Sequence, residues 1–367
     1  MLKAGIIGLP NVGKSTLFNA ILRAHKAPAE NYPFCTIEPN IGVVQVPDER
    51  LEKLAAVVKA PRIIHAAIEF VDIAGLVKGA SKGEGLGNKF LSHIREVDAL
   101  VHVLRCFEDP DVVHVTGSID PIRDLEIVNA ELILADLESL HRHREKIAKD
   151  IKRHDKTALL EDALMQRLEQ HLNSGQLACT LKLYPEERAV TRNFFLLTDK
   201  PVIYALNVKE QDISAAALNP AVQRVREYVQ THQGCEAVVI AAQLESELVD
   251  LSPEEALEYL KELGVTETGL SALIRSTYHL LGLRTFFTFN ENEARAWTIH
   301  AGATAPKAAG VVHTDFERGF IKAEVIKWND LVESGSVARA RETGHYRTEG
   351  KEYEVQDGDV LLFKFHV

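Results

Sequence analysis

The sequence has little of what marks secreted, membrane-spanning or metal-cluster proteins. Its four cysteines (Cys35, Cys106, Cys179 and Cys235) lie far apart and include no C-x-x-C pair. Reduced thiols are therefore expected rather than a disulfide framework or a zinc site. No stretch approaches the roughly 18 apolar residues of a membrane span, and no apolar run follows a basic patch at the N-terminus. These absences predict a cytoplasmic protein with no signal peptide and no membrane contact.

An excess of basic residues is also lacking. The chain of 367 residues has a net charge of -11, with 46% hydrophobic and 26% charged residues. These proportions are typical of an ordinary soluble protein, and the length allows two or three domains. Any contact with nucleic acid must therefore use a local basic face rather than the whole surface.

A phosphate-binding motif stands close to the N-terminus. The stretch Gly8-Leu-Pro-Asn-Val-Gly13-Lys14-Ser15-Thr16 follows an apolar run, Ala4–Ile7, and opens a helix-like segment. The glycines let successive backbone N–H groups face a phosphate chain. Lys14 is predicted to reach the β- and γ-phosphates as a catalytic group, and Ser15 to ligate Mg²⁺. The other predicted nucleotide contacts of the loop are Asn11, Val12, Gly13 and Thr16.

Apolar runs typical of buried strands alternate with helical patterns through the first half of the chain. This alternation predicts an α/β fold with a doubly wound, mainly parallel sheet. The expected strands are Ala4–Ile7, Ile41–Val46, Ile68–Val71, Ala99–Leu104, Val202–Leu206 and Ala237–Ile240.

A helical insertion of about eighty residues, 119–199, interrupts this pattern. Two apolar stripes at helical spacing predict an antiparallel hairpin, for which a partner-binding role and a plain packing seam both stay open. After Gly282 short strands predict a small mixed β domain. The first stripe is Ile133, Leu137, Leu140, Ile147 and Ile151, with Arg144 in the gap, and the second is Leu160, Leu164, Leu168 and Leu172. The strands expected after Gly282 are Phe286–Phe289, Ala296–Ile299, Ile321–Val325 and Val360–Phe365, with a short helix or turn at Trp328–Ser336.

A second motif, Asp72-Ile-Ala-Gly75, ends the third expected strand. In phosphate-loop proteins an Asp at this point holds Mg²⁺ and the Gly N–H contacts the γ-phosphate. The glycine-rich run 79–87 that follows is predicted to be a switch that orders on the γ-phosphate, with a plain flexible loop as the alternative. Thr36, in the irregular segment before the second strand, is the candidate for a second Mg²⁺ ligand.

The base-recognition element is expected after the fifth strand, where Asn207-Val208-Lys209-Glu210 stands in place of N-K-x-D. The longer Glu210 displaces the carboxylate that would accept hydrogen bonds from guanine, and Val208 removes a flanking Lys. Asn207 can still bond the N6/N7 edge of adenine. The sequence therefore predicts ATP rather than GTP.

The position after Gly75 is Leu76, which has no polar group to orient an attacking water. Hydrolysis is thus expected to be slow or to use another group. His114 is the candidate catalytic residue on this chain. A structural role for His114, a group supplied by a partner and a bound monovalent cation are the alternatives.

Taken together, these motifs resemble the YchF-type Obg-like ATPases of the TRAFAC class of phosphate-loop GTPases. The resemblance covers nearly the whole chain, including 8–20, 32–40, 70–90, 207–210 and 294–326. It implies an Obg-type nucleotide-binding domain at 1–281, interrupted by the insertion at 119–199, and a β-grasp TGS domain at 282–367. At 241–243 the sequence Ala-Ala-Gln departs from the S-A-K of many relatives.

The resemblance also implies a Mg²⁺-dependent ATPase that associates with the 70S ribosome or its large subunit and regulates translation or a stress response. ATP and ADP, the ribosome, and ribosomal RNA or tRNA are the implied partners, K⁺ is a candidate ion, and a monomer is expected. The leading alternative is a ribosome- or protein-binding adaptor whose ATPase is incidental. A GTPase is the lesser one.

Overall fold

The computed structural model of the chain describes residues 1–25, 40–73, 86–110 and 117–366. Their contacts divide the chain into two compact units, each described by itself below. The first unit holds Met1–Ala24, residues 40–42 and the described part of Glu69–Leu273. The second holds Val43–Ile68 and residues 274–366. The domain limits 1–281 and 282–367 stay a prediction.

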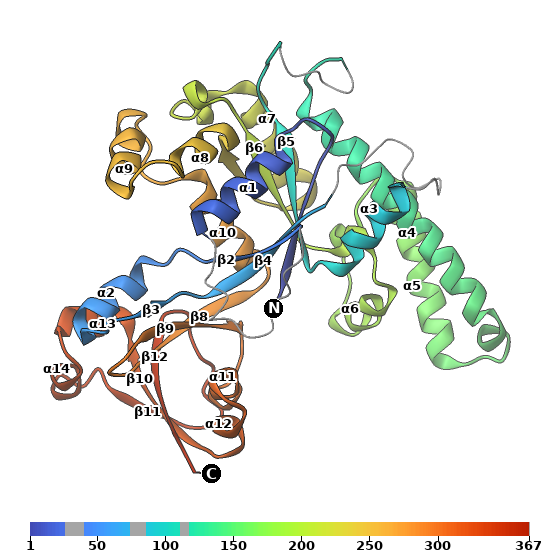
Figure 1. Cartoon of the computed structure of the whole chain (residues 1–367). Coiled ribbons are helices and arrows are strands. Elements are labelled where there is room, and N and C mark those ends of the chain that lie inside the picture. The colour runs from blue at the N-terminus through green and yellow to red at the C-terminus, as the bar shows by residue number, and fades with distance from the viewer. Residues whose placement is uncertain (26–39, 74–85, 111–116, 367) are drawn as a thin grey trace. The chain divides into compact units, whose positions relative to one another are not determined.

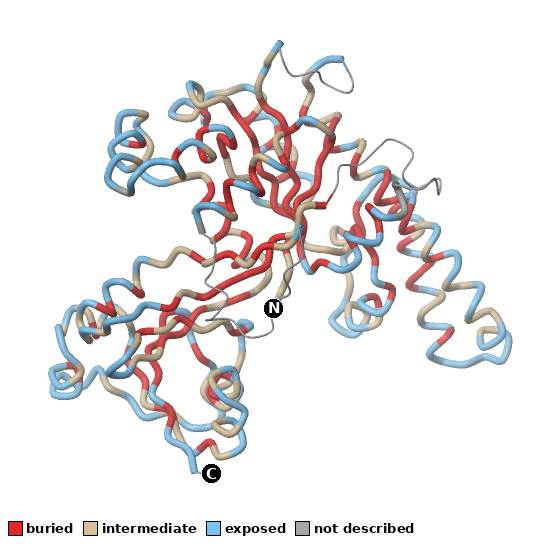
Figure 2. The backbone as a smooth tube through the Cα atoms, viewed as in Figure 1, coloured by how far each residue is buried: buried red, intermediate tan, exposed pale blue. Residues whose placement is uncertain are grey.

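A six-stranded sheet in the order β2-β4-β1-β5-β6-β7 forms the centre of the first unit (Figure 1). The pairings β1 with β4, β1 with β5, β5 with β6, and β6 with β7 are all parallel. Every residue of β5 is buried, and Figure 2 shows the central strands in red. All six expected strands are therefore confirmed, and each of their ends agrees to within one residue. Their bounds are β1 Lys3–Ile7, β2 Ile41–Gln45, β4 Ala67–Asp72, β5 Ala99–Arg105, β6 Val202–Asn207 and β7 Ala237–Ile240.

Helices connect these strands, as buried parallel strands require. No helix among the described residues is both long and apolar enough to cross a membrane. Apart from α2, which belongs to the second unit, the α-helices up to residue 280 are α1 Lys14–His25, α3 Leu86–Glu96, α4 Pro121–Lys152, α5 Lys156–Asn173, α6 Pro185–Thr191, α7 Pro220–Gln233, α8 Ala242–Leu248, α9 Pro253–Glu262 and α10 Gly269–Leu280.

The predicted hairpin is confirmed and consists of α4 and α5, while the bounds 119–199 of the insertion stay a prediction. Asp120 and Asp155 cap the two helices, since their carboxylates accept hydrogen bonds from backbone N–H groups of the first turns. One predicted member of the seam is wrong, because Leu160 is 46% exposed. A constant spacing of four rotates about 40° per step around a helix of 3.6 residues per turn, so the stripe drifts off the seam. Met165 is fully buried there instead.

The second unit holds a mixed six-stranded sheet in the order β11-β10-β12-β8-β9-β3. The predicted late strands are confirmed, and α11 and α12 follow β9 along the chain. An apolar core built around Phe286, Val325 and Phe363 lies in this unit. Its elements are α2 Glu49–Val58, β3 Ile63–Ile64, β8 Leu283–Phe289, β9 Ala294–His300, α11 Ala305–Val312, α12 Thr314–Arg318, β10 Phe320–Lys327, α13 Trp328–Ser334, α14 Val337–Glu342, β11 Arg347–Glu349 and β12 Asp359–Phe365.

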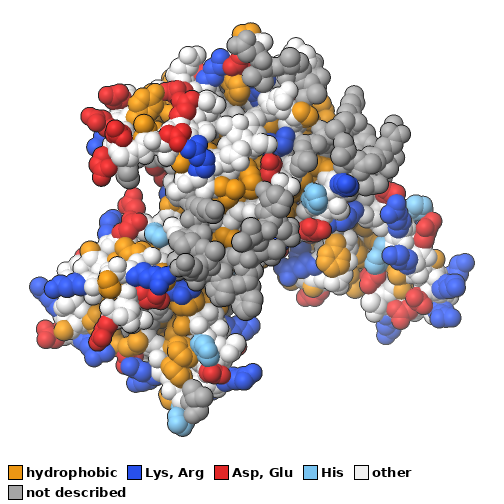
Figure 3. All heavy atoms as spheres, in the orientation of Figure 1, with side chains coloured by type: hydrophobic (Ala, Val, Ile, Leu, Met, Phe, Trp, Pro, Cys, Tyr) orange, Lys and Arg blue, Asp and Glu red, His pale blue; other side chains and the backbone are white. Residues whose placement is uncertain are grey.

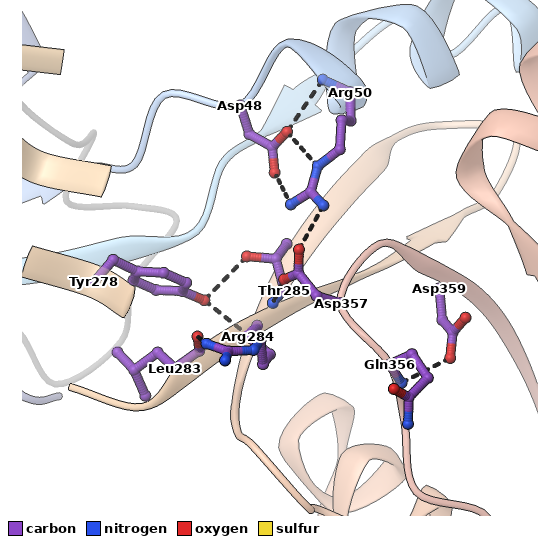
Figure 4. Close-up of polar contacts among 9 residues, drawn as sticks. All are labelled: Asp48, Arg50, Tyr278, Leu283, Arg284, Thr285, Gln356, Asp357 and Asp359. Carbon is purple, nitrogen blue, oxygen red and sulfur yellow. Dashed lines mark hydrogen bonds and ion pairs between the residues drawn. The ribbon is translucent and has the colours of Figure 1, made fainter. Parts of the chain in front are cut away.

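An ion-pair network joins residues 43–68 to the C-terminal strands within this unit (Figure 4). The Arg50 guanidinium donates to both carboxylate oxygens of Asp48 at 2.8 Å and to Asp357 at 2.6 Å. Asp357 in turn accepts a 2.8 Å hydrogen bond from the Thr285 backbone N–H at the start of β8. Segment 43–68 therefore folds with the C-terminal strands, although it precedes them by more than two hundred residues in the sequence.

Candidate functional site

The phosphate loop joins β1 to α1 at the carboxyl edge of the first sheet, where ligands of open α/β folds bind. Gly8 and Gly13 adopt positive φ values of 146° and 99°. A Cβ on Gly8 would lie 2.5 Å from the Val103 carbonyl oxygen, so the loop needs glycine there. Leu17 N–H makes a 2.9 Å helical bond to Gly13 O. The N–H groups before it have no partner within the helix and form an anion-binding end.

Lys14, the first residue of α1, is only 8% exposed. Its ammonium donates a 2.7 Å hydrogen bond to the carbonyl oxygen of Leu9, within the same loop. Burial lowers the pKa of Lys14 to about 8, and the charge of Asp72 opposes that shift. The loop thus holds a partly desolvated cation, which a phosphate would pair with favourably.

His102 lies near this cation on the central strand β5 and is 2% exposed. Its Nε2 has no hydrogen-bond partner among the described residues. Burial, followed by the charge of Lys14, lowers the pKa of His102 to about 3. His102 is therefore neutral at physiological pH and adds no charge that would compete with Lys14 for an anion.

Ser15 and Asp72 bring two oxygen ligands together. Ser15 Oγ, in the first turn of α1, donates a 3.2 Å hydrogen bond to Asp72 Oδ2 at the end of β4. Mg²⁺ prefers hard oxygen ligands and commonly uses only one or two from the protein, with waters and phosphate oxygens completing the octahedron. The pair fits such an ion. In the described parts of the chain, no group of three or more His, Cys, Asp or Glu side chains is placed so that it could hold a metal ion.

Asn207, the last residue of β6, connects the phosphate loop to the base-recognition side of the site. Its Nδ2 donates to the Val12 carbonyl oxygen at 3.0 Å, and its Oδ1 accepts from the Ala242 N–H at 3.0 Å. Asn207 is 4% exposed, so both bonds are shielded from water. A Cβ on Gly13 would lie 2.5 Å from Asn207 Nδ2. The Asn207 amide is therefore engaged by the protein itself, which does not support the predicted adenine contact by this side chain.

A cavity of about 750 Å³ extends from the phosphate loop along these residues. Glu210 lies at its wall, and Tyr259 of α9 donates a hydrogen bond from its hydroxyl to Glu210 Oε1. Lys209 pairs with Asp109 at 3.6 Å. The cavity is lined by Asn11, Gly13, Thr16, Phe107, Asp109, Asn207, Val208, Lys209, Glu210, Gln211, Ala242, Gln243 and Leu263.

The structure therefore brings most of the predicted site residues together, from three separate segments of the chain. The phosphate-loop residues, Asp72, and the element Asn207–Glu210 meet at one edge of the sheet. Four predicted positions lie outside the described residues. These are Thr36, Gly75, Leu76 and His114, whose roles stay predictions.

Two residues of the site were missed by the sequence interpretation. His102 could have been noticed as the one polar side chain among the apolar residues of Ala99–Leu104. Tyr259 had no local signal, since it lies 49 residues beyond Glu210 and on a different helix. Only the tertiary fold brings the hydroxyl of Tyr259 to that carboxylate.

Comparison with known proteins connects this geometry to a family. A family model described as a 50S ribosome-binding GTPase matches residues 3–135. Another, named for the C-terminal part of YchF GTPases and described as a protein of unknown function, matches residues 283–366.

Full-length relatives are also similar. The chain is 50% identical over 366 residues to the ribosome-binding ATPase YchF of Bacillus subtilis, covering 100% of both chains. It is 51% identical to the protein of the same name from Haemophilus influenzae, covering 100% of this chain and 99% of the relative. The solved structure of the Schizosaccharomyces pombe YchF GTPase superposes with a TM-score of 0.88 at 38% identity, covering 99% of this chain and 97% of that one. The names of these relatives differ on the nucleotide, since two say ATPase and one says GTPase.

Proposed function

Because this chain belongs to the YchF family, we propose that it is a phosphate-loop ATPase that associates with the ribosome. The observation that carries the proposal is the meeting of Lys14, Ser15 and Asp72 at the mouth of the loop. A desolvated ammonium and two hard oxygen ligands are what a magnesium-bound triphosphate requires. The names of the bacterial relatives supply the ribosome as partner.

The chain's own groups would bind and orient the triphosphate. The Lys14 ammonium would leave the Leu9 carbonyl and pair with phosphate oxygens, which restores the interactions that it lost on burial. Ser15 would ligate Mg²⁺ and Asp72 would hold it through water, while the ion neutralises charge on the phosphates. Asn207 fixes the loop backbone at Val12, so the N–H groups that face the phosphates need no rearrangement on binding.

Glu210 and Val208 favour adenine in this proposal. Tyr259 keeps the Glu210 carboxylate at the cavity wall, on a side chain one methylene longer than the Asp of guanine-specific proteins. Val208 is 3% exposed and supplies an apolar surface at the same wall. A carboxylate in this position makes no pair of hydrogen bonds with guanine, so the selectivity for guanine is lost.

The finer parts of the proposal come from the sequence. Thr36 would be a second Mg²⁺ ligand, Gly75 a γ-phosphate contact and His114 the group that orients water, with K⁺ as a candidate activating ion. We further propose that the protein works as a cytoplasmic monomer, contacts ribosomal RNA or tRNA, and regulates translation or a stress response.

Nucleotide affinities and turnover rates test the choice of ATP. We expect the wild-type protein to bind ATP at least tenfold more tightly than GTP, and Glu210→Asp to shift that ratio toward GTP by about tenfold, which corresponds to about 1.4 kcal/mol. Tyr259→Phe should shift it in the same direction by a smaller factor, because it frees the carboxylate. Glu262→Asp, an exposed acid at the end of α9, is the matched control. A clear preference of the wild type for GTP would contradict the proposal.

Ribosome association is tested by co-sedimentation with 70S ribosomes in the presence of a non-hydrolysable ATP analogue, ADP or no nucleotide. A switch requires affinities that differ between these states. In cells that lack the protein, Lys14→Ala should fail to restore the wild-type phenotype. Full restoration would instead favour an adaptor with an incidental ATPase.

A further inference from the structure

The outer face of α4 carries a row of cations near the end of the hairpin. Arg142, Lys146, Lys149 and Arg153 follow one another at spacings of four, three and four residues, which places them on one side of the helix and its C-cap. Residues 141–156 contain seven Lys or Arg and three Asp or Glu, a local charge of +4 in a chain whose net charge is -11. The end of the hairpin is thus basic within an acidic protein.

Cations on the inner face of the hairpin have a different role. Arg144 donates to Asp162 at 2.8 Å and to Glu169 at 3.1 Å, across the seam between α4 and α5. His143 lies 3.0 Å from Glu161. These side chains are bonded within the fold itself, so they offer little attraction to an outside partner.

The cations on the outer face of α4 have fewer acidic partners than those on the inner face. Arg142 pairs with Glu138 and Arg153 with Asp150, both on the same exposed helix. Figure 3 shows Lys and Arg side chains projecting around the free end of the hairpin. Four exposed lysines form no ion pair with any described residue: Lys146, Lys149, Lys152 and Lys156.

We propose that the basic row and its neighbours Lys152 and Lys156 form a contact surface for the phosphate backbone of RNA. The inference rests on the proposed function, because the ribosome supplies the RNA. From Arg142 to Arg153 the row extends about 16 Å at roughly 1.5 Å per residue. Phosphates follow one another every few ångströms along a nucleic-acid strand, so several of them can face the row.

The composition of the row also indicates which part of the RNA it recognises. Residues 141–156 include no Phe, Tyr or Trp, so no aromatic platform for stacked bases is present. Lysines bind phosphate as point charges and carry no base information. The contact is therefore independent of sequence and sensitive to salt, and the attraction directs the end of the hairpin, rather than the acidic remainder of the chain, toward the RNA.

The test compares three full-length proteins binding to a 20-base-pair RNA duplex between 50 and 200 mM KCl. They are the wild type, a hairpin variant with Lys146, Lys149, Lys152 and Lys156 all changed to Gln, and a control with Lys182, Lys261, Lys307 and Lys351 changed to Gln. The control lysines are exposed and its net charge equals that of the hairpin variant. We expect the hairpin variant to bind at least tenfold more weakly. The slope of log affinity against log salt should fall by about 3 to 4, while the control stays close to wild type.

The outcomes separate this inference from the proposed function. Unchanged RNA affinity and slope in the hairpin variant, or no binding of the duplex by the wild type, would overturn the RNA surface. So would an effect of the lysines seen only on vesicles of phosphatidylcholine with 30% phosphatidylserine, which would indicate a lipid surface. Co-sedimentation with 70S ribosomes is measured on the same samples. If the wild type binds the duplex through these lysines but never binds ribosomes, the proposed partner fails and the RNA surface stands. ATP turnover at the wild-type rate shows that each variant is folded.

Discussion

Lysines occur in two opposite settings in this protein. Lys14 is 8% exposed, donates to a carbonyl of its own loop and has a pKa lowered by burial. The hairpin lysines, such as Lys146 and Lys149, are exposed and form no ion pair with the described residues. Both settings suit a phosphate, but they select different kinds of phosphate ligand.

The difference follows from solvation. A buried ammonium has already lost much of its water, so a phosphate that enters the loop restores a strong interaction and is held at a defined point. An exposed row keeps its hydration and attracts any polyanion over a longer distance, with an affinity that falls as salt screens the charges. The first arrangement gives positional accuracy for one triphosphate, and the second gives orientation toward a large charged partner.

Replacement of Lys14 should have the largest effect. Lys14→Met keeps the length of the side chain and removes its charge, so we expect ATP turnover to fall at least 100-fold, in the range seen when a preorganised charge-stabilising contact is lost. The nucleotide-free protein should unfold at the same or a higher temperature, because a desolvated charge is gone. Turnover and thermal unfolding measure both effects.

The hairpin variant described above provides the contrast, since it should leave ATP turnover in the absence of ribosomes unchanged. A Lys14→Met protein that melts well below the wild type and still turns over ATP within tenfold of the normal rate would contradict the assignment. It would mean that Lys14 serves the fold rather than the phosphate.

Lys14 should give the stability of the free protein and its affinity for ATP opposite dependences on pH. Burial lowers the pKa of Lys14 from 10.5 to about 8. Between these values the unfolded chain binds more protons than the folded one, so this residue makes the free protein more stable as pH rises from about 8 to 10.5. Phosphate favours the protonated amine, so ATP affinity should fall as pH rises above about 8, and binding at pH 9 should take up close to one proton.

Calorimetry in two buffers with different ionisation enthalpies measures that proton uptake. The Lys14→Met protein should take up no such proton when it binds ATP. Equal uptake by the variant and the wild type would assign the proton to another group.

The sequence predicted those parts of the site that depend on local patterns. Strands buried on both faces are continuous apolar runs, so the six strands could be located, and two motifs assigned Ser15 and Asp72 to the same ion. The bond between Tyr259 and Glu210 could not, because it depends on where α9 packs. The two residues of β3 are likewise too few for any periodicity, so the pairing of β3 with β9 left no trace in the sequence.

The hairpin shows the same limit within one element. Its existence followed from apolar residues at helical spacing, but Leu160 is exposed and Met165 is buried. A stripe chosen by equal spacing does not say which helix lies opposite, and the partner decides which residues form the seam. Arg142 and Arg144 stand two residues apart and therefore lie on opposite sides of α4. The sequence placed Arg144 in the gap of the predicted stripe, but only the fold shows its partners on α5.

Arg142 and Arg144 support the prediction with the smallest expected effect. Arg144 is 33% exposed and bonded to Asp162 and Glu169 across the seam, whereas Arg142 is 70% exposed on the outer face. Arg144→Met should lower the free energy of unfolding by about 1 kcal/mol, a value kept small because water screens the pairs. Backbone amide exchange in α4 and α5 should become faster, with ATP turnover unchanged. Arg142→Met is the matched control and should leave exchange unaltered. If both variants loosened the hairpin equally, the distinction between cations used by the fold and cations left for a partner would fail, and with it the reason for placing RNA on the outer face.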